Sequence, residues 1–329
     1  MKVLLVRLSS MGDLIHTLPA VSDLARMRPD VELHWLCEEG FADIARLHPF
    51  VRKVHTLSWR RWRKELAKRA TWRAIGRLKD SLRQERFDFV LDSQGLLKSA
   101  LPAKMAGVPV KGLDKHSARE SLAAFFYTQT FFVQKGQDAV LRNCLLFAQA
   151  FAYEMPSEIS FGALVPQNIC LSDINSPYCV ALHATSRDSK LWRQGNWREL
   201  MTKLHESGGY TVYLPWGNAQ ELARARELAD GLPYARVCEK MNLLQAAALL
   251  DGAQCVAGVD TGLLHLANAL DKPLVGIYTD TDPQKTGVQQ SAKARNIGGV
   301  GQMPETEEVY HLLLECMAAQ QTGCQGEEK

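Results

Sequence analysis

Several short polar clusters of this chain follow apolar segments, and the sharpest of them is residues 260–265, Asp-Thr-Gly-Leu-Leu-His. If a helix begins near Thr261, its first backbone N–H groups and the positive end of its dipole favour an anion such as a diphosphate. Gly262 then lets a phosphate approach the backbone closely, and His265 lies one turn further along. The same spacing fits a helix that is simply capped by Asp260 or Thr261 and carries a core histidine, and the local pattern does not decide between the two interpretations.

The second cluster is the loop 183–192, which offers the hydroxyl groups of Thr185 and Ser186 and the ammonium group of Lys190. Hydroxyl and ammonium groups are ordinary donors to phosphate oxygens, so this loop suits the same kind of ligand. Without further context, a solvated surface loop is the simpler interpretation.

Two further clusters carry aspartates where helices are expected to begin. Asp13 ends the segment 9–13, Ser-Ser-Met-Gly-Asp, at the edge of the first predicted strand. A carboxylate in that place faces any cleft between the domains, although taken alone it is more simply a helix cap. Residues 92–98 repeat the arrangement after a later strand and are open to the same two interpretations.

Several other catalytic motifs are absent from the sequence. No GxxxxGK[ST] is present, which excludes a P-loop kinase or ATPase, and no GxGxxG follows the first apolar segment, which argues against a dehydrogenase. Neither HExxH nor another tight metal-ligand spacing occurs. The segment Asp280-Thr281-Asp282 resembles a metal-binding D-x-D, but Pro283 follows it, and we predict a turn there.

The elements that must position these clusters alternate between strands and helices. In the first half we predict strands at 2–8, 31–39 and 87–92 and helices at 14–28, 41–48 and within 59–86. In the second half we predict strands at 178–183, 210–217, 254–260 and 273–280 and helices at 196–208, 221–231, 241–253 and 261–272. Such alternation is typical of parallel sheets covered on both faces, so we expect an α/β protein with two doubly wound, Rossmann-like domains.

The domain boundary is expected where the pattern restarts. A chain of 329 residues is too long for one typical core, and Ser176-Pro177 breaks it before the next predicted strand. A linker at about 170–177 therefore separates domains 1–172 and 173–329. We predict a last helix at 307–321, which is able to pack back on the first domain, and a frayed tail at 322–329.

The charge of the chain is small overall but uneven. The net charge is +3, whereas residues 59–86 hold eleven Lys/Arg against three Asp/Glu, so that 11 − 3 gives +8. This excess indicates an acidic partner. We expect Trp59, Trp62 and Trp72 of this segment to pack while its cations stay in water.

The remaining composition indicates a cytoplasmic protein. Eight cysteines are present without a CxxC pair, and we expect them to be free and buried. No apolar run approaches the roughly 18 residues that span a bilayer. Arg7 interrupts the apolar N-terminal run, which favours a buried strand over a signal peptide.

Taken together, the motifs resemble a known family of glycosyltransferases. The segments SSMGD-x-x-HTLP, DSQGLLKS, HATSRDSKLW, LPWG and VDTGLLHLANALDKP follow one another in the order seen in the ADP-heptose:lipopolysaccharide heptosyltransferases, glycosyltransferase family 9. The resemblance runs from Met1 to about residue 315, includes the tract RRWRK at 60–64, and is greatest for the heptosyltransferase I type.

The resemblance implies a GT-B fold and a role for each matching residue. It implies that the N-terminal domain binds the acceptor, with Asp13 as general base, and that the C-terminal domain binds the donor. The implied acceptor-binding residues are Arg60, Arg61, Arg63, Lys64 and Arg119. The implied donor-binding residues are Thr185, Ser186 and Lys190 at the diphosphate and sugar, Glu221 at the ribose, Met241 at the adenine, and Asp260, Thr261, Gly262 and His265 at the diphosphate-binding helix start. The sequence departs from the family at Ser186, where threonine is expected, and at Ser189, where aspartate is usual.

The implied reaction is an inverting transfer of L-glycero-D-manno-heptose from ADP-heptose to a Kdo residue of Kdo2-lipid A in lipopolysaccharide core synthesis. ADP-heptose is then a co-substrate, and neither a cofactor nor a metal is expected. The acceptor and the basic segment imply peripheral association with the cytoplasmic face of the inner membrane. The alternatives are a heptosyltransferase II that adds a later heptose, a GT-B-fold sugar-nucleotide epimerase and a non-catalytic binding protein. Nucleic-acid binding by the basic segment is weakly supported.

Overall fold

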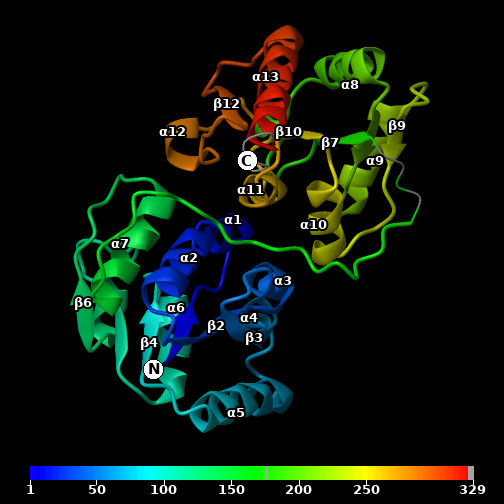
Figure 1. Cartoon of the computed structure of the whole chain (residues 1–329). Helices are drawn as coiled ribbons and strands as arrows, with labels where there is room; N and C mark the ends of the chain where they lie inside the picture. Colours follow the sequence, from blue (N-terminus) through cyan, green and yellow to red (C-terminus); the bar gives the residue numbers. More distant parts are fainter. Residues whose placement is uncertain (173, 175–176, 325–329) are drawn as a thin grey trace. The chain divides into compact units, whose positions relative to one another are not determined.

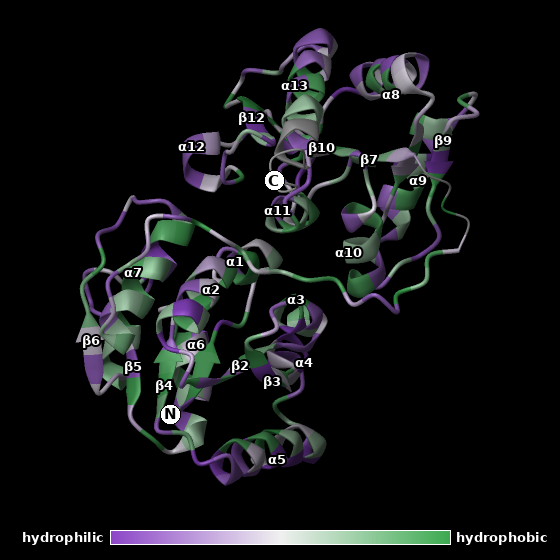
Figure 2. Ribbon diagram, viewed as in Figure 1, coloured by the Kyte–Doolittle hydropathy of each residue, from purple (hydrophilic) through white to green (hydrophobic). Residues whose placement is uncertain are grey.

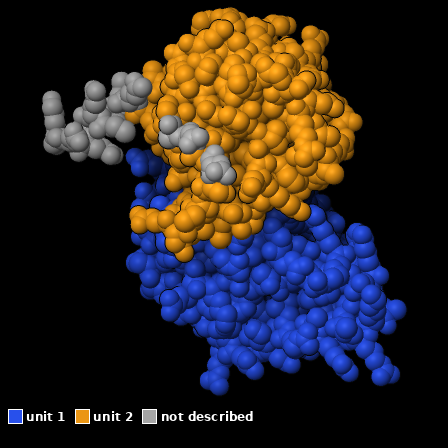
Figure 3. All heavy atoms as spheres, turned by 90° about the vertical axis from the view of Figure 1, so that its right-hand side faces the viewer, with its two compact units in different colours: residues 1–164 blue, residues 165–329 orange. Residues whose placement is uncertain are grey.

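The computed structural model describes residues 1–172, 174 and 177–324, with only the backbone described for 321–324. The chain forms two compact units, Met1–Leu164 and Val165–Lys329, which Figure 3 colours separately. Each unit is built on a six-stranded sheet whose strands pair in parallel, with helices around it (Figure 1). The expected linker falls partly on residues 173, 175 and 176, which lie outside the described residues.

Unit 1 has the strand order β3-β2-β1-β4-β5-β6. The strands are β1 (Lys2–Val6), β2 (Glu32–Glu38), β3 (Val51–Leu57), β4 (Phe89–Asp92), β5 (Val110–Leu113) and β6 (Gln129–Phe131). The helices are α1 (Met11–Ile15), α2 (Leu18–Met27), η1 (Glu39–Phe41), α3 (Ala42–Arg46), α4 (Trp59–Lys64), α5 (Arg69–Gln84), α6 (Leu97–Ala103), η2 (Lys104–Ala106), η3 (Ser121–Phe126) and α7 (Ala139–Phe151). Because β1 and β4 are central neighbours, the loops that follow them lie side by side.

The sheet of unit 1 is covered on both faces. On one face Leu4, Val6 and Val90 form a core with residues of α4, α5 and α6, among them Trp62 and Leu82. On the other face α2 packs against α7, whose Phe151 ring contacts Phe89 of β4. Burial on both faces explains why β1 and β4 read as continuous apolar runs.

Unit 2 has the strand order β12-β11-β10-β7-β8-β9. The strands are β7 (Tyr178–Leu182), β8 (Thr211–Leu214), β9 (Ala235–Val237), β10 (Cys255–Val259), β11 (Leu274–Tyr278) and β12 (Ala294–Gly298). The helices are η4 (Asp188–Lys190), α8 (Gln194–Gly208), α9 (Ala219–Ala229), α10 (Leu243–Asp251), α11 (Gly262–Ala269), α12 (Pro283–Thr286) and α13 (Thr306–Cys324). Val309, Leu313 and Cys316 of α13 belong to the core of unit 2.

Some predictions for individual segments are wrong. The helix expected at 14–28 is divided into α1 and α2, because Pro19 lacks the N–H that a continuous helix needs and lies instead in the first turn of α2. The tail expected from residue 322 is helical as far as Cys324, the end of α13. Residues 325–329 of that predicted tail lie outside the described residues.

Burial also corrects two expectations. Trp62 is buried as expected, whereas Trp72 is exposed, because the helical position it takes on α5 faces away from the sheet. Of the cysteines with described side chains, Cys170 is exposed and the others are buried. Cys324 has no described side chain. In the part of the chain that the structure describes, no helix has the length and apolar character to cross a membrane.

Candidate active site

Asp13 lies at the edge of the unit 1 sheet, on the short helix α1 that follows β1. Its Oδ2 atom accepts hydrogen bonds from the backbone N–H of Ser10 (2.7 Å) and from the Ser10 hydroxyl (3.0 Å), so Asp13 is part of the helix cap. Its Oδ1 atom lies 3.2 Å from Nη2 of Arg7, and 27% of its side chain is exposed. The capping role expected from the sequence is therefore real, and it leaves the carboxylate partly open to a ligand.

Arg7 is the buried partner of this carboxylate. It follows β1, is 8% exposed, and also donates from Nη1 to the carbonyl of Ser93 in the loop after β4. Its Nε atom is buried and finds no hydrogen-bond partner among the described residues. Burial lowers the pKa of the Arg7 guanidinium, but Asp13 and Asp92 act in the opposite direction. Arg7 thus links the Asp13 carboxylate to the loop that follows β4, the strand next to β1.

The pKa of Asp13 reflects opposed influences. Burial would raise the pKa of this carboxyl, but Arg7 and the two hydrogen bonds from Ser10 act against it, and the pKa falls below its usual value. The guanidinium of Arg119 lowers it further. Asp13 is therefore ionised at neutral pH, as a general base must be, at the cost of some basicity.

Residues that follow β4 hold the segment before Asp13 in place through hydrogen bonds. Gln94 accepts a hydrogen bond from the N–H of Leu8 and donates one to the carbonyl of Ser9, at 2.8 and 2.9 Å. Lys98 donates to the Ser9 hydroxyl over 2.8 Å. The sequence leaves it open whether Asp92 is only a helix cap. Asp92 is fully buried and accepts hydrogen bonds from Ser99 and other donors. Burial raises its pKa. These contacts make Asp92 structural and place a cation, Lys98, beside the segment that carries Asp13.

The predicted acceptor-binding cations lie on two elements of unit 1. Arg60, Arg61, Arg63 and Lys64 are exposed residues of α4, and Arg119 is exposed in the loop before η3. Burial lowers the pKa of Lys98, and Asp13, Arg60 and Arg119 are near enough to shift that pKa as well. The structure therefore brings Arg60 and Arg119 to the region of Asp13. Arg61 instead donates to Ser58, at 2.8 Å.

In unit 2, three loops meet at Asp260. They follow β7, β10 and β11, which are adjacent strands. Lys190 places its Nζ atom 2.6 Å from Oδ2 of Asp260, and both side chains are 11% exposed. Thr281 donates to the same oxygen over 2.8 Å, and Thr185 donates to the backbone carbonyl of Asp260 over 2.7 Å. The predicted residues Thr185, Lys190 and Asp260 are thus brought together.

The structure confirms that a helix begins near Thr261, and it identifies which of Asp260 and Thr261 is the N-cap. α11 begins at Gly262 with Thr261, not Asp260, as the N-cap, and the Thr261 side chain makes no capping hydrogen bond. In the part of the chain that the structure describes, Thr261 thus leaves the first N–H groups of α11 uncapped, and such groups favour an anion. His265 is buried within α11.

Glu221 belongs to a cavity that the loop after β7 shares with α9. The cavity has a volume of about 400 Å³ and is lined by Thr185, Ser186, Glu221 and Arg224, among others. The two carboxylate oxygens of Glu221 accept hydrogen bonds from Gly217 and Asn218, each at 2.7 Å. Glu221 is therefore held in place by the cap of its own helix, and it lines the same cavity as the hydroxyls of Thr185 and Ser186.

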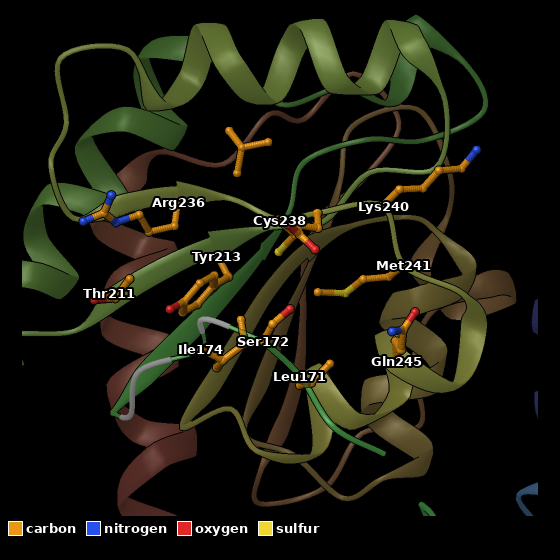
Figure 4. Close-up of a pocket in the computed structure, with 12 residues that line it drawn as sticks. Leu171, Ser172, Ile174, Thr211, Tyr213, Arg236, Cys238, Lys240, Met241 and Gln245 are labelled. Atoms are coloured by element: carbon orange, nitrogen blue, oxygen red, sulfur yellow. The ribbon is translucent and has the colours of Figure 1, made fainter.

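Met241 lines a second cavity of unit 2, with a volume of about 350 Å³. Figure 4 shows its side chain pointing toward Cys238 and Ser172, while Lys240 points away. Gln245 on α10 and Tyr213 on β8 complete the walls. A thioether, a thiol and an aromatic ring suit a flat apolar group such as a nucleobase.

The segment 280–282 forms a bend after β11 that ends at the N-cap of α12, so its side chains take part in the fold itself. Asp280 accepts a hydrogen bond from the Ser189 hydroxyl at 2.6 Å, and Asp282 caps α12 through the N–H of Gln284 at 3.0 Å. Ser189, which departs from the family pattern, thereby joins the loop after β7 to the loop after β11. Thr281 donates to Asp260 as described above.

Sequence reasoning did not assign roles to Arg7, Thr281 or Arg224. Arg7 has a visible signal, a cation inside an apolar strand, because such a charge is buried only beside a partner. Arg224 donates from Nη2 to the carbonyl of Trp192 at 2.7 Å and supports the loop after β7. Nothing in the local sequence distinguishes Thr281 from an ordinary turn residue.

Comparison with known proteins agrees with this geometry. Residues 75–313 match the model of glycosyltransferase family 9 (heptosyltransferase). The chain is 45% identical over 291 residues to lipopolysaccharide heptosyltransferase 1 of Pseudomonas aeruginosa, covering 87% of this chain and 81% of that protein. It is 41% identical over 289 residues to lipopolysaccharide heptosyltransferase 1 of Escherichia coli, covering 87% and 90%.

The solved structures agree with these sequence relatives. The structure of Escherichia coli heptosyltransferase WaaC with ADP superimposes with a TM-score of 0.89 at 36% identity. The match covers 96% of this chain and 100% of that chain. The structure of Escherichia coli heptosyltransferase II gives a TM-score of 0.74 at 21% identity, a likeness of fold. Two doubly wound units of this kind form the GT-B fold, as expected. The chain belongs to glycosyltransferase family 9, the heptosyltransferases.

Proposed function

We propose that this heptosyltransferase transfers L-glycero-D-manno-heptose from ADP-heptose to a Kdo residue of Kdo2-lipid A, with inversion at the anomeric carbon. The observation that carries the proposal is the cluster around Asp260, where Lys190, Thr185 and the open start of α11 meet. Relatives that share this architecture support it, because they are lipopolysaccharide heptosyltransferases and one was solved with ADP-2-deoxy-2-fluoro heptose.

In this proposal unit 2 binds the donor. The diphosphate lies at the N-terminus of α11, near Thr261, Gly262 and His265, where N–H groups and Lys190 face its charge. Lys190 pairs with Asp260, so a diphosphate bound here shares or takes over that ammonium group. Ser186 and Thr185 contact the phosphate and sugar oxygens from the cavity beside Glu221.

The nucleoside is assigned to the two cavities of unit 2. Glu221 holds the ribose hydroxyls, for which its fixed carboxylate still has free lone pairs. Met241 packs against the adenine in the cavity of Figure 4. ADP-heptose is consumed as a co-substrate, and the proposed transfer needs no cofactor.

Unit 1 binds the acceptor and supplies the base. The Kdo hydroxyl oxygen attacks the anomeric carbon while the bond from that carbon to the diphosphate oxygen breaks. Asp13 accepts the hydroxyl proton during the attack, a contribution of about 10²–10⁴-fold. ADP leaves with its electron pair, and Lys190 with the N–H groups of α11 stabilises the growing phosphate charge.

The acidic acceptor accounts for the cations of α4. Arg60, Arg61, Arg63, Lys64 and Arg119 are exposed on unit 1 and are suited to Kdo carboxylates and lipid A phosphates. The +8 excess of residues 59–86 favours an anionic membrane surface in the same way. We therefore assign the protein a peripheral place on the cytoplasmic face of the inner membrane.

The test is transfer to two acceptors that differ by one heptose. The purified chain is incubated with ADP-heptose and either Kdo2-lipid A or its mono-heptosylated product, and the acceptors are weighed by mass spectrometry. The proposal expects Kdo2-lipid A to gain one heptose with release of one ADP. A gain by the mono-heptosylated acceptor alone would make the chain a type II enzyme, and conversion of ADP-heptose without any acceptor would indicate an epimerase. Either result would overturn the proposed substrate.

A further inference from the structure

Exposed large apolar side chains of unit 1 are concentrated on one of its two helical layers. Five of them, Leu66, Trp72, Leu101, Leu122 and Phe125, lie on or between α4, α5, α6 and η3, which we call the basic layer. On α2 and α7, which cover the other face of the sheet, the one such residue among those described is Met27, at 39% exposure. The rest lie at the N-terminus, after β6 and along 155–164. The two helical layers of unit 1 therefore differ in the number of large apolar side chains that they expose.

The first part of the basic layer is an indole at the start of α5. Trp72 is 60% exposed, and its Nε1–H donates to the carbonyl of Leu66 over 2.8 Å, which satisfies the indole and fixes the ring. Leu66 is itself exposed beside it. A tryptophan whose N–H is already bonded presents an apolar surface with little left for water to solvate, as in the aromatic belts of membrane interfaces.

The second part lies on α6 and η3, which pack against each other. Leu101 projects from α6, and Leu122 and Phe125 project from η3, with 80% of Phe125 exposed. The start of η3 is held in place because Glu120 accepts a hydrogen bond from the N–H of Leu97 over 2.7 Å. The apolar side chains are therefore presented by a fixed scaffold.

The same layer also carries exposed cations. Several exposed lysines and arginines of the layer and its loops form no ion pair in the part of the chain that the structure describes, among them Arg63, Lys64, Arg69, Arg73, Arg77 and Lys104. Figure 2 shows this mixture on α5, where hydrophilic and hydrophobic segments share one helix. A basic helix with exposed apolar residues is the composition of interfacial helices that lie on anionic lipid.

We propose that the basic layer docks on an anionic phospholipid bilayer, with Trp72, Leu122 and Phe125 entering the interface and the cations facing the headgroups. This rests on the proposed function, because it specifies how the enzyme meets its lipid-linked acceptor. A second copy of the chain is the less favourable occupant, since pairing two such layers would bring together two segments of charge +8.

The test is binding to vesicles made of phosphatidylglycerol and phosphatidylethanolamine, measured by co-sedimentation at low salt. We expect each of Trp72→Ser, Leu122→Ser and Phe125→Ser to weaken the partition coefficient by about threefold, and the triple variant by about tenfold or more. The matched control, Met27→Ser, removes an exposed apolar side chain from the other layer and should leave binding unchanged. Vesicles of phosphatidylcholine alone should bind the wild-type chain weakly.

A second readout separates this proposal from the proposed function. Transfer to a deacylated, water-soluble form of the acceptor should be unchanged in the triple variant, while transfer to acceptor in vesicles falls with binding. Equal vesicle binding by the triple variant and the wild type would overturn the lipid-facing layer, even if the transferase activity is confirmed. So would an equal loss in Met27→Ser, or a triple variant that changes oligomeric state without losing vesicle binding. Absence of transfer by the wild type to either acceptor, with normal vesicle binding, would instead count against the proposed function.

Discussion

The charge state of Asp13 depends on Arg7 more than on any other favourable contact. The guanidinium lies 3.2 Å from Oδ1 and lowers a pKa that burial would otherwise raise. In Arg7→Gln we expect the pKa of Asp13 to rise, so the acid limb of the kcat/KM profile moves to higher pH. Turnover at neutral pH should fall by about 10- to 100-fold, because the carboxylate also loses its orientation. The pH-rate profile between pH 5 and 9 measures both effects.

Two variants separate this electrostatic role from a structural one. Arg7→Lys keeps a positive charge near Asp13 and should keep the acid limb near its original place. Ser10→Ala removes one exposed hydrogen bond to Asp13 and should move the limb in the same direction as Arg7→Gln, by a smaller amount. A lower rate in Arg7→Gln with the limb unmoved would show that Arg7 only supports the fold.

Individual site residues differ in how far they are predictable from sequence. Asp13, Thr185, Lys190 and Asp260 can be identified because each follows an apolar strand, where a parallel sheet places its ligands. The pairing of Lys190 with Asp260 cannot, because it joins loops 70 residues apart. The sequence indicates that Arg7 needs a partner if it is buried, but it does not identify that partner, since Ser93 and Asp13 come from other elements.

At the scale of elements, β5 depends on having no side chain at Gly112. A Cβ added there would lie 2.5 Å from Cε2 of Tyr127, whose hydroxyl donates to the buried Asp92 over 2.8 Å. Gly112→Ala must displace this ring, and we expect it to lower the free energy of unfolding by about 1–3 kcal/mol. Urea denaturation followed by circular dichroism measures the change.

The matched control is a glycine inside a helix. No atom outside its own turn lies within 4 Å of a Cβ added at Gly76 on α5. Gly76→Ala should therefore stabilise the protein by about 0.5–1 kcal/mol, through helix propensity alone. If both variants changed stability equally, the contact between β5 and Tyr127 would have no energetic importance.

Elements are predictable where burial on both faces gives continuous apolar runs. The strands β1, β4, β7, β10 and β11 have that character, and the sequence identifies each of them. The edge strand β3 has exposed charged residues, and β6 and β9 have three residues each, so their sequences lack a recognisable period. Their place in the sheets comes from pairing with neighbours, which a local pattern does not contain.

At the scale of the whole molecule, buried histidines make stability depend on pH. Burial lowers the pKa of His48 in unit 1 and of His183 in unit 2 to about 4, against about 6.5 in an unfolded chain. The unfolded state therefore binds more protons between these values, and stability is lost as the pH falls from about 6.5 toward 4. Each histidine should account for about 2 kcal/mol of the difference between pH 7.5 and pH 5.0.

Equilibrium urea unfolding at the two pH values checks this expectation. In His48→Gln the loss of stability between pH 7.5 and pH 5.0 should be smaller than in the wild type by about one histidine's share. Equal losses in the wild type and His48→Gln would contradict the account.

The most direct test of the central claim, that Asp13 is the base of a heptosyl transfer, is to compare donor binding and turnover in Asp13→Asn. The substitution keeps the size of the side chain and removes its capacity to accept the Kdo hydroxyl proton. We predict that affinity for ADP-heptose, measured by calorimetry, stays within about twofold, because the proposed donor contacts all lie in unit 2, while turnover on Kdo2-lipid A falls by about two orders of magnitude or more. Turnover near that of the wild type would remove Asp13 from the reaction.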